Sequence, residues 1–122
     1  MLKPKTIQEL TSRGLVDKKE IAFMANVQTE KQGQKGFWQK HVVSLNGEIV
    51  CFTRCDKGLF GVSLYRVDGQ KIDKSQIAEA NIVKEPGMFD TIAITLKNGE
   101  KVVAQVLQTN EPNLEKLATE LK

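Results

Sequence analysis

Between residues 21 and 107 the apolar residues come in short runs that mostly alternate with polar ones and are separated by turn signals. Asn46-Gly47 and Asn98-Gly99 are dipeptides typical of two-residue type I′ turns, and Pro86-Gly87 has the order expected of a type II turn. Turn signals recur about every 8 to 12 residues with no helical pattern between them, which predicts consecutive antiparallel hairpins. Seven strands are expected, over residues 21–28, 37–45, 48–54, 59–67, 77–83, 90–97 and 100–107.

The two ends of the chain have helical patterns instead. Thr6 and Glu9 have the spacing of a capping box, and Gly14 follows as a candidate C-cap, so a short N-terminal helix is predicted. Asn110 can cap a second helix. The apolar stripe of that helix has the spacing i, i+3, i+4 and i+7 and consists of Leu114, Leu117, Ala118 and Leu121. We therefore expect residues 1–20 to be a helical extension packed on a domain that spans residues 21–122.

The stretch from Gly47 to Ile82 has a distinctive order of segments. These are the hydrophobic strand Ile49-Val50-Cys51-Phe52-Thr53, the basic turn 54–57, the apolar pair Leu59-Phe60 and the polar run 71–77. This order resembles the bacterial pleckstrin-homology (PH) domain family, and the C-terminal amphipathic helix extends the likeness over residues 21–122. The resemblance implies a mostly β, seven-stranded antiparallel PH-like barrel with a C-terminal capping helix. It also implies a scaffold for protein assembly or for lipid headgroups rather than an enzyme.

Lysines flank the first predicted hairpin, and an aromatic-basic step opens the second strand. Lys31, Lys35 and the run Trp38-Gln39-Lys40-His41 resemble in part the eukaryotic phosphoinositide-binding pattern, although Gln39 and His41 stand where that pattern has basic residues. We define a basic rim as Lys31, Lys35, Lys40 and Arg54. Four such charges predict weak, salt-sensitive attachment to an anionic membrane surface.

Charge and composition narrow the class of partner. The chain has 18 Lys and Arg against 15 Asp and Glu, a net charge of +3, and its lysines are spread along the whole length. Nucleic-acid binders usually concentrate such residues on one element, so no nucleic-acid partner is expected. No window approaches the ~18 apolar residues of a membrane span, and no apolar segment of a secretory signal follows Met1. With two cysteines and no disulfide framework, a cytoplasmic location is expected.

The candidate nucleophiles do not assemble into a catalytic group. Cys51 and Cys55 lie four residues apart in one predicted strand, so their side chains share a face about 13 Å apart, too far for a disulfide. A structural zinc site needs four ligands, and His41 is the only histidine. A two-residue turn at 46–47 places His41 opposite Phe52, on the face away from Cys51. The sequence predicts no catalytic residue, no metal site and no cofactor.

The hairpin formed by the second and third predicted strands is apolar on both faces in the register that pairs Leu45 with Glu48. A sheet with one face in water normally alternates apolar and polar residues, so the outer face needs a cover. The N-terminal helix is one candidate cover, and a protein partner or a second copy of the chain is the other. The predicted partner interface consists of Trp38, Val42, Ile49 and Cys51.

These observations favour a non-catalytic PH-like binding or assembly module that presents an apolar face to a protein partner or to another copy of itself. The alternative function is weak binding of anionic lipid headgroups through the basic rim. An enzyme ranks third, because the sequence offers no second histidine and no nucleophile–base pair.

Overall fold

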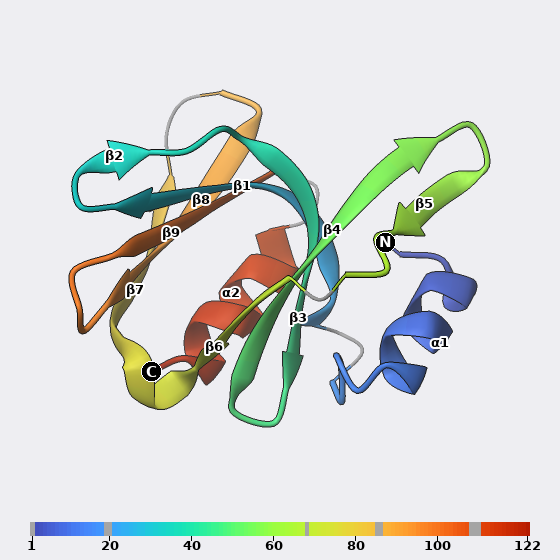
Figure 1. Cartoon of the computed structure of the whole chain (residues 1–122), viewed down its shortest axis with the longest axis horizontal. Helices are drawn as coiled ribbons and strands as arrows, with labels where there is room; N and C mark the ends of the chain where they lie inside the picture. The colour runs from blue at the N-terminus through green and yellow to red at the C-terminus, as the bar shows by residue number, and fades with distance from the viewer. Residues whose placement is uncertain (1, 19–20, 68, 85–86, 108–110) are drawn as a thin grey trace.

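The computed structural model describes residues 2–18, 21–67, 69–84, 87–107 and 111–122 (Figure 1). Within these residues the chain is mostly β, with two α-helices. The elements are α1 (Pro4–Ser12), β1 (Phe23–Lys31), β2 (Gln34–Lys35), β3 (Gln39–Asn46), β4 (Ile49–Gly58), β5 (Gly61–Leu64), β6 (Gln70–Asp73), the 3-10 turn η2 (Lys74–Gln76), β7 (Ile77–Lys84), β8 (Phe89–Leu96), β9 (Lys101–Leu107) and α2 (Glu111–Glu120).

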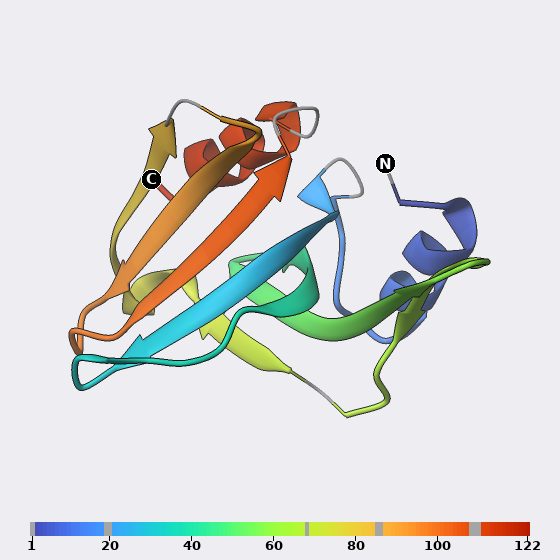
Figure 2. The ribbon, with the colours of Figure 1, turned by 90° about the horizontal axis from the view of Figure 1, so that it is seen from above.

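The strands form one antiparallel sheet with the order β5-β4-β3-β1-β9-β8-β7, while β2 pairs with β1 and β6 pairs with β4. The sheet is strongly curved, and α2 lies against its concave side (Figures 1 and 2). The predicted seven-stranded barrel is wrong in two respects, because the described residues form nine strands and the sheet does not close. In the described residues β7 ends the strand order and pairs with neither β5 nor β6, which lie beside β4. Helix α2 packs on β7, β8 and β9 and covers the opening.

The main core lies between the concave side of the sheet and α2. It joins the inward residues of β1, β3, β4, β6, β8 and β9 to the apolar stripe of α2. Leu114, Leu117, Ala118 and Leu121 are all buried in this core, so the structure confirms the predicted stripe. The predicted cap, Asn110, lies outside the described residues.

Two predicted turns have different geometries from those expected. In the β3–β4 hairpin Asn46 pairs with Ile49 and Leu45 with Val50, so the predicted pairing of Leu45 with Glu48 is wrong by two residues. Gly47 alone has positive φ (62°), which suits the first central position of a type II′ turn rather than a type I′ turn. A shift of two keeps every side chain on its predicted face, although His41 now lies opposite Arg54 rather than Phe52.

The second Asn-Gly pair lies in a longer loop. Leu96 N–H donates to the Glu100 carbonyl at 2.8 Å, which leaves three residues between this hydrogen-bonded pair, and Gly99 has positive φ (92°). This is the arrangement of a three-residue hairpin loop that ends in a left-handed residue. The predicted type II turn at Pro86-Gly87 includes Pro86, which lies outside the described residues.

Two segments contain regular structure that the apolar pattern does not predict. Strand β1 continues to Lys31 and turns back at Gln32-Gly33, both with positive φ, into the short strand β2. Residues 70–73 form β6, which pairs with β4 through Phe52 and Gln70. Both segments are mostly polar and lie at an edge of the sheet, and Ile72 is the only apolar residue of β6.

The N-terminal helix begins earlier than its capping pattern predicts. Helix α1 starts at Pro4, with Lys3 at the N-cap, so the proposed Thr6 cap is wrong and Thr6 is buried within the helix. The predicted glycine stop is confirmed. Gly14 has φ 69°, its N–H donates to Thr11, and the N–H of Leu15 donates to Leu10, which together form a Schellman motif.

The N-terminal segment, described over residues 2–18 and 21–22, covers the convex face of the β3–β4 hairpin. Its apolar residues form a second cluster with that face: Leu2, Leu10, Leu15, Val16, Ala22, Val42, Cys51 and Cys55. Ser44 Oγ donates to the Leu15 carbonyl at 2.6 Å, and Asp17 N–H donates to the Leu45 carbonyl at 3.1 Å. Of the two covers considered for this face, the structure shows the chain's own N-terminal segment.

Candidate binding groove

A groove opens on the convex face of the sheet where β1 and β9 separate. Their ladder ends at the pair Asn26 and Gln105. Beyond this point β1 continues along β3 as far as Phe23, while β9 continues along β8 as far as Leu107. Each strand follows its other neighbour, so the sheet splays and leaves a hollow of about 240 Å³ between its two halves.

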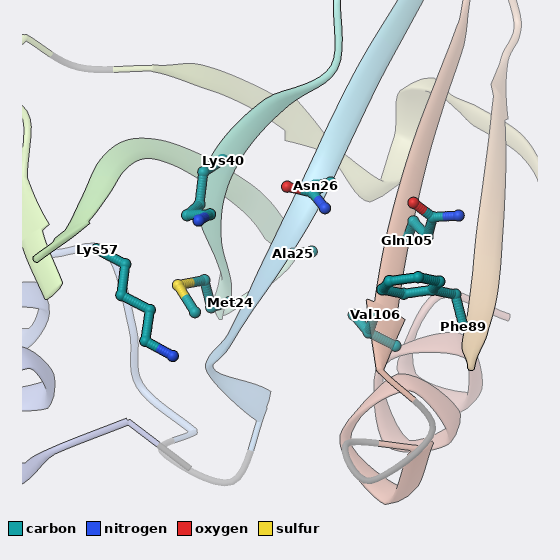
Figure 3. Close-up of a pocket in the computed structure, with 8 residues that line it drawn as sticks. All are labelled: Met24, Ala25, Asn26, Lys40, Lys57, Phe89, Gln105 and Val106. Atoms are coloured by element: carbon teal, nitrogen blue, oxygen red, sulfur yellow. The ribbon is translucent and has the colours of Figure 1, made fainter. Parts of the chain in front are cut away.

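The groove has a basic side, an apolar floor and an aromatic side (Figure 3). It is lined by Met24, Ala25, Asn26, Lys40, Lys57, Phe89, Gln105 and Val106. Lys40 on β3 and Lys57 on β4 lie on one side, with Met24 of β1 next to them, and Phe89 lies on the other side above Val106.

Strand register places the polar groups of the groove in one row across the sheet. Lys40 pairs with Asn26, Asn26 pairs with Gln105, and Gln105 pairs with Thr91 of β8. Directly opposite residues in an antiparallel pair have their side chains on one face, about 5 Å apart. The row therefore presents a cation and two side-chain amides side by side at the point where the strands separate.

The charged residues that line the groove are all positive. Two of its eight lining residues, Lys40 and Lys57, are cationic, and none of the eight is acidic. Phe89 and Met24 contribute apolar surface, and Phe89 is 37% exposed. Such a concave site with an apolar lining and a few convergent polar groups is the usual form of a ligand pocket. Its chemistry suits an anionic group attached to an apolar one.

The four residues of the predicted partner interface do not share one exposed face. Val42 and Cys51 are buried in the second cluster beneath the N-terminal segment, and Ile49 packs partly against that cluster. Trp38 lies just before β3 and is 46% exposed. A partner can therefore reach Trp38 and part of Ile49, whereas Val42 and Cys51 are accessible only if the N-terminal segment moves away.

The four residues of the basic rim do not form one cluster. Lys31 and Lys35 lie at the tip of the β1–β2 hairpin, where Lys35 is opposite Glu30. Lys40 is opposite Asn26, five residues back along β1 from Lys31, a separation of about 17 Å along the strand. The Arg54 guanidinium lies over the ring of Tyr65, 4.7 Å from its centroid. Only Lys40 of this set reaches the groove.

The cysteines and the histidine do not form a reactive pair. Both cysteines are buried and neither is in a disulfide, and burial raises the pKa of Cys55 to about 11, so its thiol is protonated at neutral pH. Burial also lowers the pKa of His41, whose Nδ1 lies 2.9 Å from the Gln39 carbonyl oxygen. Within the described residues no cluster of three or more His, Cys, Asp or Glu side chains could hold a metal ion.

Sequence reasoning misses most of the groove. The pattern Asp56-Lys57-Gly58 predicts a turn, but β4 runs through this segment and directs Lys57 towards Met24. Phe89 lies just outside the predicted strand 90–97. The alternation of β1 does carry a signal, because Met24, Asn26 and Gln28 are the outward residues of that strand. The sequence does not indicate where β1 and β9 separate, because this depends on the register of β1 with β3 and of β9 with β8.

Comparisons with known proteins give the fold. No protein-family model and no curated protein sequence matches the chain. Among solved structures, the PH domain of USP37 superposes with a TM-score of 0.54 at 8% identity, over 83% of this chain and 92% of that one. The C-terminal domain of an unknown protein from Leishmania infantum gives a TM-score of 0.50 at 12% identity, over 96% of this chain and 92% of that one.

At these identities the likeness shows a PH-like fold and nothing finer. The PH-like architecture expected from the segment order is thus confirmed, while membership of the bacterial family stays a prediction. Within the described residues, neither helix has the length and hydrophobicity needed to cross a bilayer.

Proposed function

We propose that this chain is a non-catalytic binding module and that the groove binds a segment of a protein partner. The segment carries an acidic side chain next to an apolar one. The observation that carries this proposal is the hollow at the separation of β1 and β9, with two lysines on one side and Phe89 on the other. PH-like folds of known structure support a binding role for the scaffold, and the groove supplies the site.

The arrangement of the lining favours this ligand on physical grounds. An acidic side chain between Lys40 and Lys57 gains two charge-assisted contacts in a partly desolvated hollow, where such contacts are stronger than on an open surface. An apolar side chain beside it covers Met24 and Phe89 and removes both from water. Asn26 and Gln105 can donate to and accept from the main chain of the bound segment and so fix its direction.

A non-catalytic role is supported by the state of the reactive groups. The Cys55 thiol is buried with a raised pKa, and both cysteines lie in the second cluster, away from the lining of the groove. The groove itself holds lysines, amides and apolar side chains. A lysine nucleophile would need a carbonyl substrate and a neighbouring base, and none of the eight lining residues is a carboxylate or a histidine.

Selection of ligands from a random peptide library displayed on phage tests the proposal. We expect the selected peptides to combine Asp or Glu with an aromatic or large aliphatic residue. The double variant Lys40→Glu/Lys57→Glu should bind them at least about tenfold more weakly, because the ligand then meets two like charges. Phe89→Ser should also weaken binding, through loss of apolar contact.

Matched controls separate the groove from general effects of charge and hydrophobicity. Lys116→Glu changes an exposed lysine on α2, on the opposite side of the sheet, and Met88→Ser removes an exposed apolar residue next to Phe89 that does not line the groove. Both controls should bind the selected peptides like the wild type. Selected peptides without acidic residues, or equal binding by the Lys40→Glu/Lys57→Glu variant, would contradict the proposal.

Self-association through the predicted interface and lipid binding through the basic rim stay predictions. The first now depends on Trp38 and Ile49, because the N-terminal segment covers the other two residues. The second depends on Lys31 and Lys35, because Lys40 and Arg54 lie elsewhere on the sheet. Light scattering across a concentration series checks the former. Co-sedimentation with anionic vesicles at low and high salt checks the latter.

A further inference from the structure

The turn between β4 and β5 carries an apolar feature that the groove does not explain. Leu59 and Phe60 occupy its two central positions, between the paired residues Gly58 and Gly61. Their exposed fractions are 93% and 92%, so neither side chain contributes to a core. Two-residue hairpin turns favour Gly, Asn and Asp at these positions, so turn geometry does not require a Leu-Phe pair either. We call Leu59 and Phe60 the apex.

The apex lies at the end of a hairpin, and its two side chains are almost fully exposed. The β4–β5 hairpin projects from the curved sheet and runs beside α1 in both views (Figures 1 and 2). Val62 and Leu64 of β5 pack against the second cluster and anchor the base of the hairpin. The result is a convex projection whose outermost side chains are apolar and whose base is fixed.

Lysines from a distant part of the sequence flank the apex. Lys3 and Lys5, at the start of α1, line a hollow of about 310 Å³ together with Leu59 and Phe60. Lys3 Nζ lies 3.5 Å from the Phe60 carbonyl oxygen, and both lysine side chains are exposed. Glu9 also lines the hollow, but its carboxylate pairs with Arg13 at 3.6 Å. The surroundings of the apex are therefore cationic.

We propose that the apex inserts Leu59 and Phe60 into an anionic lipid bilayer, with Lys3 and Lys5 next to the headgroup phosphates. A convex apolar tip bordered by lysines matches the layers of a bilayer surface, in which anionic headgroups overlie hydrocarbon. This site differs from the basic rim, which lies on the β1–β2 and β3–β4 hairpins. It is also independent of the groove, because neither apex residue lines the groove.

Co-sedimentation with vesicles tests the site, using phosphatidylcholine alone and phosphatidylcholine with phosphatidylserine. We expect the wild-type chain to bind the mixed vesicles and to be released by high salt. Leu59→Ser/Phe60→Ser should lower the partition coefficient at least about tenfold, since two side chains lose their transfer into hydrocarbon. Lys3→Glu/Lys5→Glu should abolish the preference for phosphatidylserine. The substituted side chains are exposed, so folding is expected to be unaffected, and circular dichroism verifies this.

Two controls and one direct probe complete the test. Val67→Ser removes an exposed apolar residue away from the apex, and Lys31→Glu/Lys35→Glu reverses the charge of the β1–β2 tip. Val67→Ser should bind vesicles like the wild type. Lys31→Glu/Lys35→Glu separates the apex from the basic rim, because binding through the apex persists in this variant. In a Trp38→Phe background, Phe60→Trp should show a blue-shifted emission with mixed vesicles and quenching by bromine-labelled acyl chains.

Several results would overturn the proposal. These are no binding of the wild-type chain to phosphatidylserine vesicles, equal binding by Leu59→Ser/Phe60→Ser, or loss of binding only when Lys31 and Lys35 are reversed. An unshifted, unquenched emission from the Phe60→Trp variant with vesicles bound would also overturn it. If Leu59→Ser/Phe60→Ser loses binding to a protein partner while its vesicle binding is unchanged, the apex is a protein interface instead.

Discussion

Gly69 shows how one missing side chain allows two strands to meet. A Cβ at this position would overlap the carbonyl oxygen of Phe52, and the next residue, Gln70, pairs with Phe52 in the β4–β6 ladder. The chain enters β6 at van der Waals contact with the backbone of β4. Only glycine fits there, because backbone atoms cannot move aside as a flexible side chain can.

Gly69→Ala should therefore destabilise the fold by about 1 to 3 kcal/mol, the usual cost of inserting a methyl group into a filled space. Gly58→Ala is a matched control, because its Cβ would lie 3.9 Å from the nearest atom, the Gly61 carbonyl oxygen. Urea denaturation of both variants measures the difference. Equal free energies of unfolding for the two variants would show that β6 does not approach β4 as described.

His41 links stability to pH. Burial lowers the pKa of its imidazole below 6.5, and the Arg54 charge acts in the same direction, while the Gln39 carbonyl partly opposes them. A histidine with a lowered folded-state pKa gives its full contribution to stability above the unfolded pKa near 6.5. That contribution is lost as the pH falls from about 6.5 through the folded-state pKa, because the unfolded chain binds the proton more readily.

We accordingly expect the free energy of unfolding of the wild type to fall between pH 7.5 and pH 5.5, and the His41→Gln variant to fall less. Carboxyl groups titrate mostly below this window; Asp73, for example, has a pKa lowered from 3.8 by hydrogen bonds from Ser75. Urea denaturation of the wild type and of His41→Gln at pH 7.5 and pH 5.5 measures how far the free energy of unfolding of each falls. A wild type whose stability rises towards pH 5.5 relative to His41→Gln would contradict the assignment.

At the scale of elements, helix α1 determines which faces of the sheet remain available to partners. Leu10 is fully buried between α1 and the β3–β4 hairpin and is central to the second cluster. The same cluster contains Cys51 and Cys55, whose thiols are protected by burial. Loosening the helix should therefore weaken the fold and expose both thiols.

Leu10→Ala should cost about 2 to 5 kcal/mol of stability and accelerate the reaction of the thiols with a disulfide reagent. In the wild type at pH 8 a pKa of about 11 leaves roughly one Cys55 thiol in a thousand as thiolate, so the reaction is slow. Gln8→Ala alters an exposed residue of the same helix and should leave both quantities unchanged. Rapid thiol reaction in the wild type would mean that α1 does not cover this face.

The elements also show what a sequence pattern can and cannot predict. Strands β7, β8 and β9 lie within two residues of their predicted bounds, because each has a period-two pattern and ends near a strong turn signal. Strand β6 is missed because only Ile72 of its four residues is buried. Hydrophobicity alone places Leu59-Phe60 inside a strand, whereas these residues form an exposed turn. Apolar character predicts burial only where something covers the residue.

At the scale of the whole molecule, the PH-like fold follows from the chain's alternation, its hairpins and its C-terminal stripe. Closure of the sheet into a barrel does not follow from these patterns, because it requires the edge strands to pair with each other. Here Lys97 N–H donates to the Gln76 carbonyl at 2.9 Å beside a bulge in β7, and α2 fills the remaining opening. The groove arises from the same geometry, since an open, splayed sheet leaves β1 and β9 apart at one end.

A two-dimensional NMR titration of the 15N-labelled chain with a peptide selected for binding shows directly whether the groove is the binding site. We expect amide shifts concentrated at the groove, in Met24, Asn26, Lys40 and Gln105, and absent from the Lys40→Glu/Lys57→Glu variant. Shifts centred on Leu59 and Phe60, on α1 or on the β1–β2 tip, or persistent shifts in the variant, would contradict it.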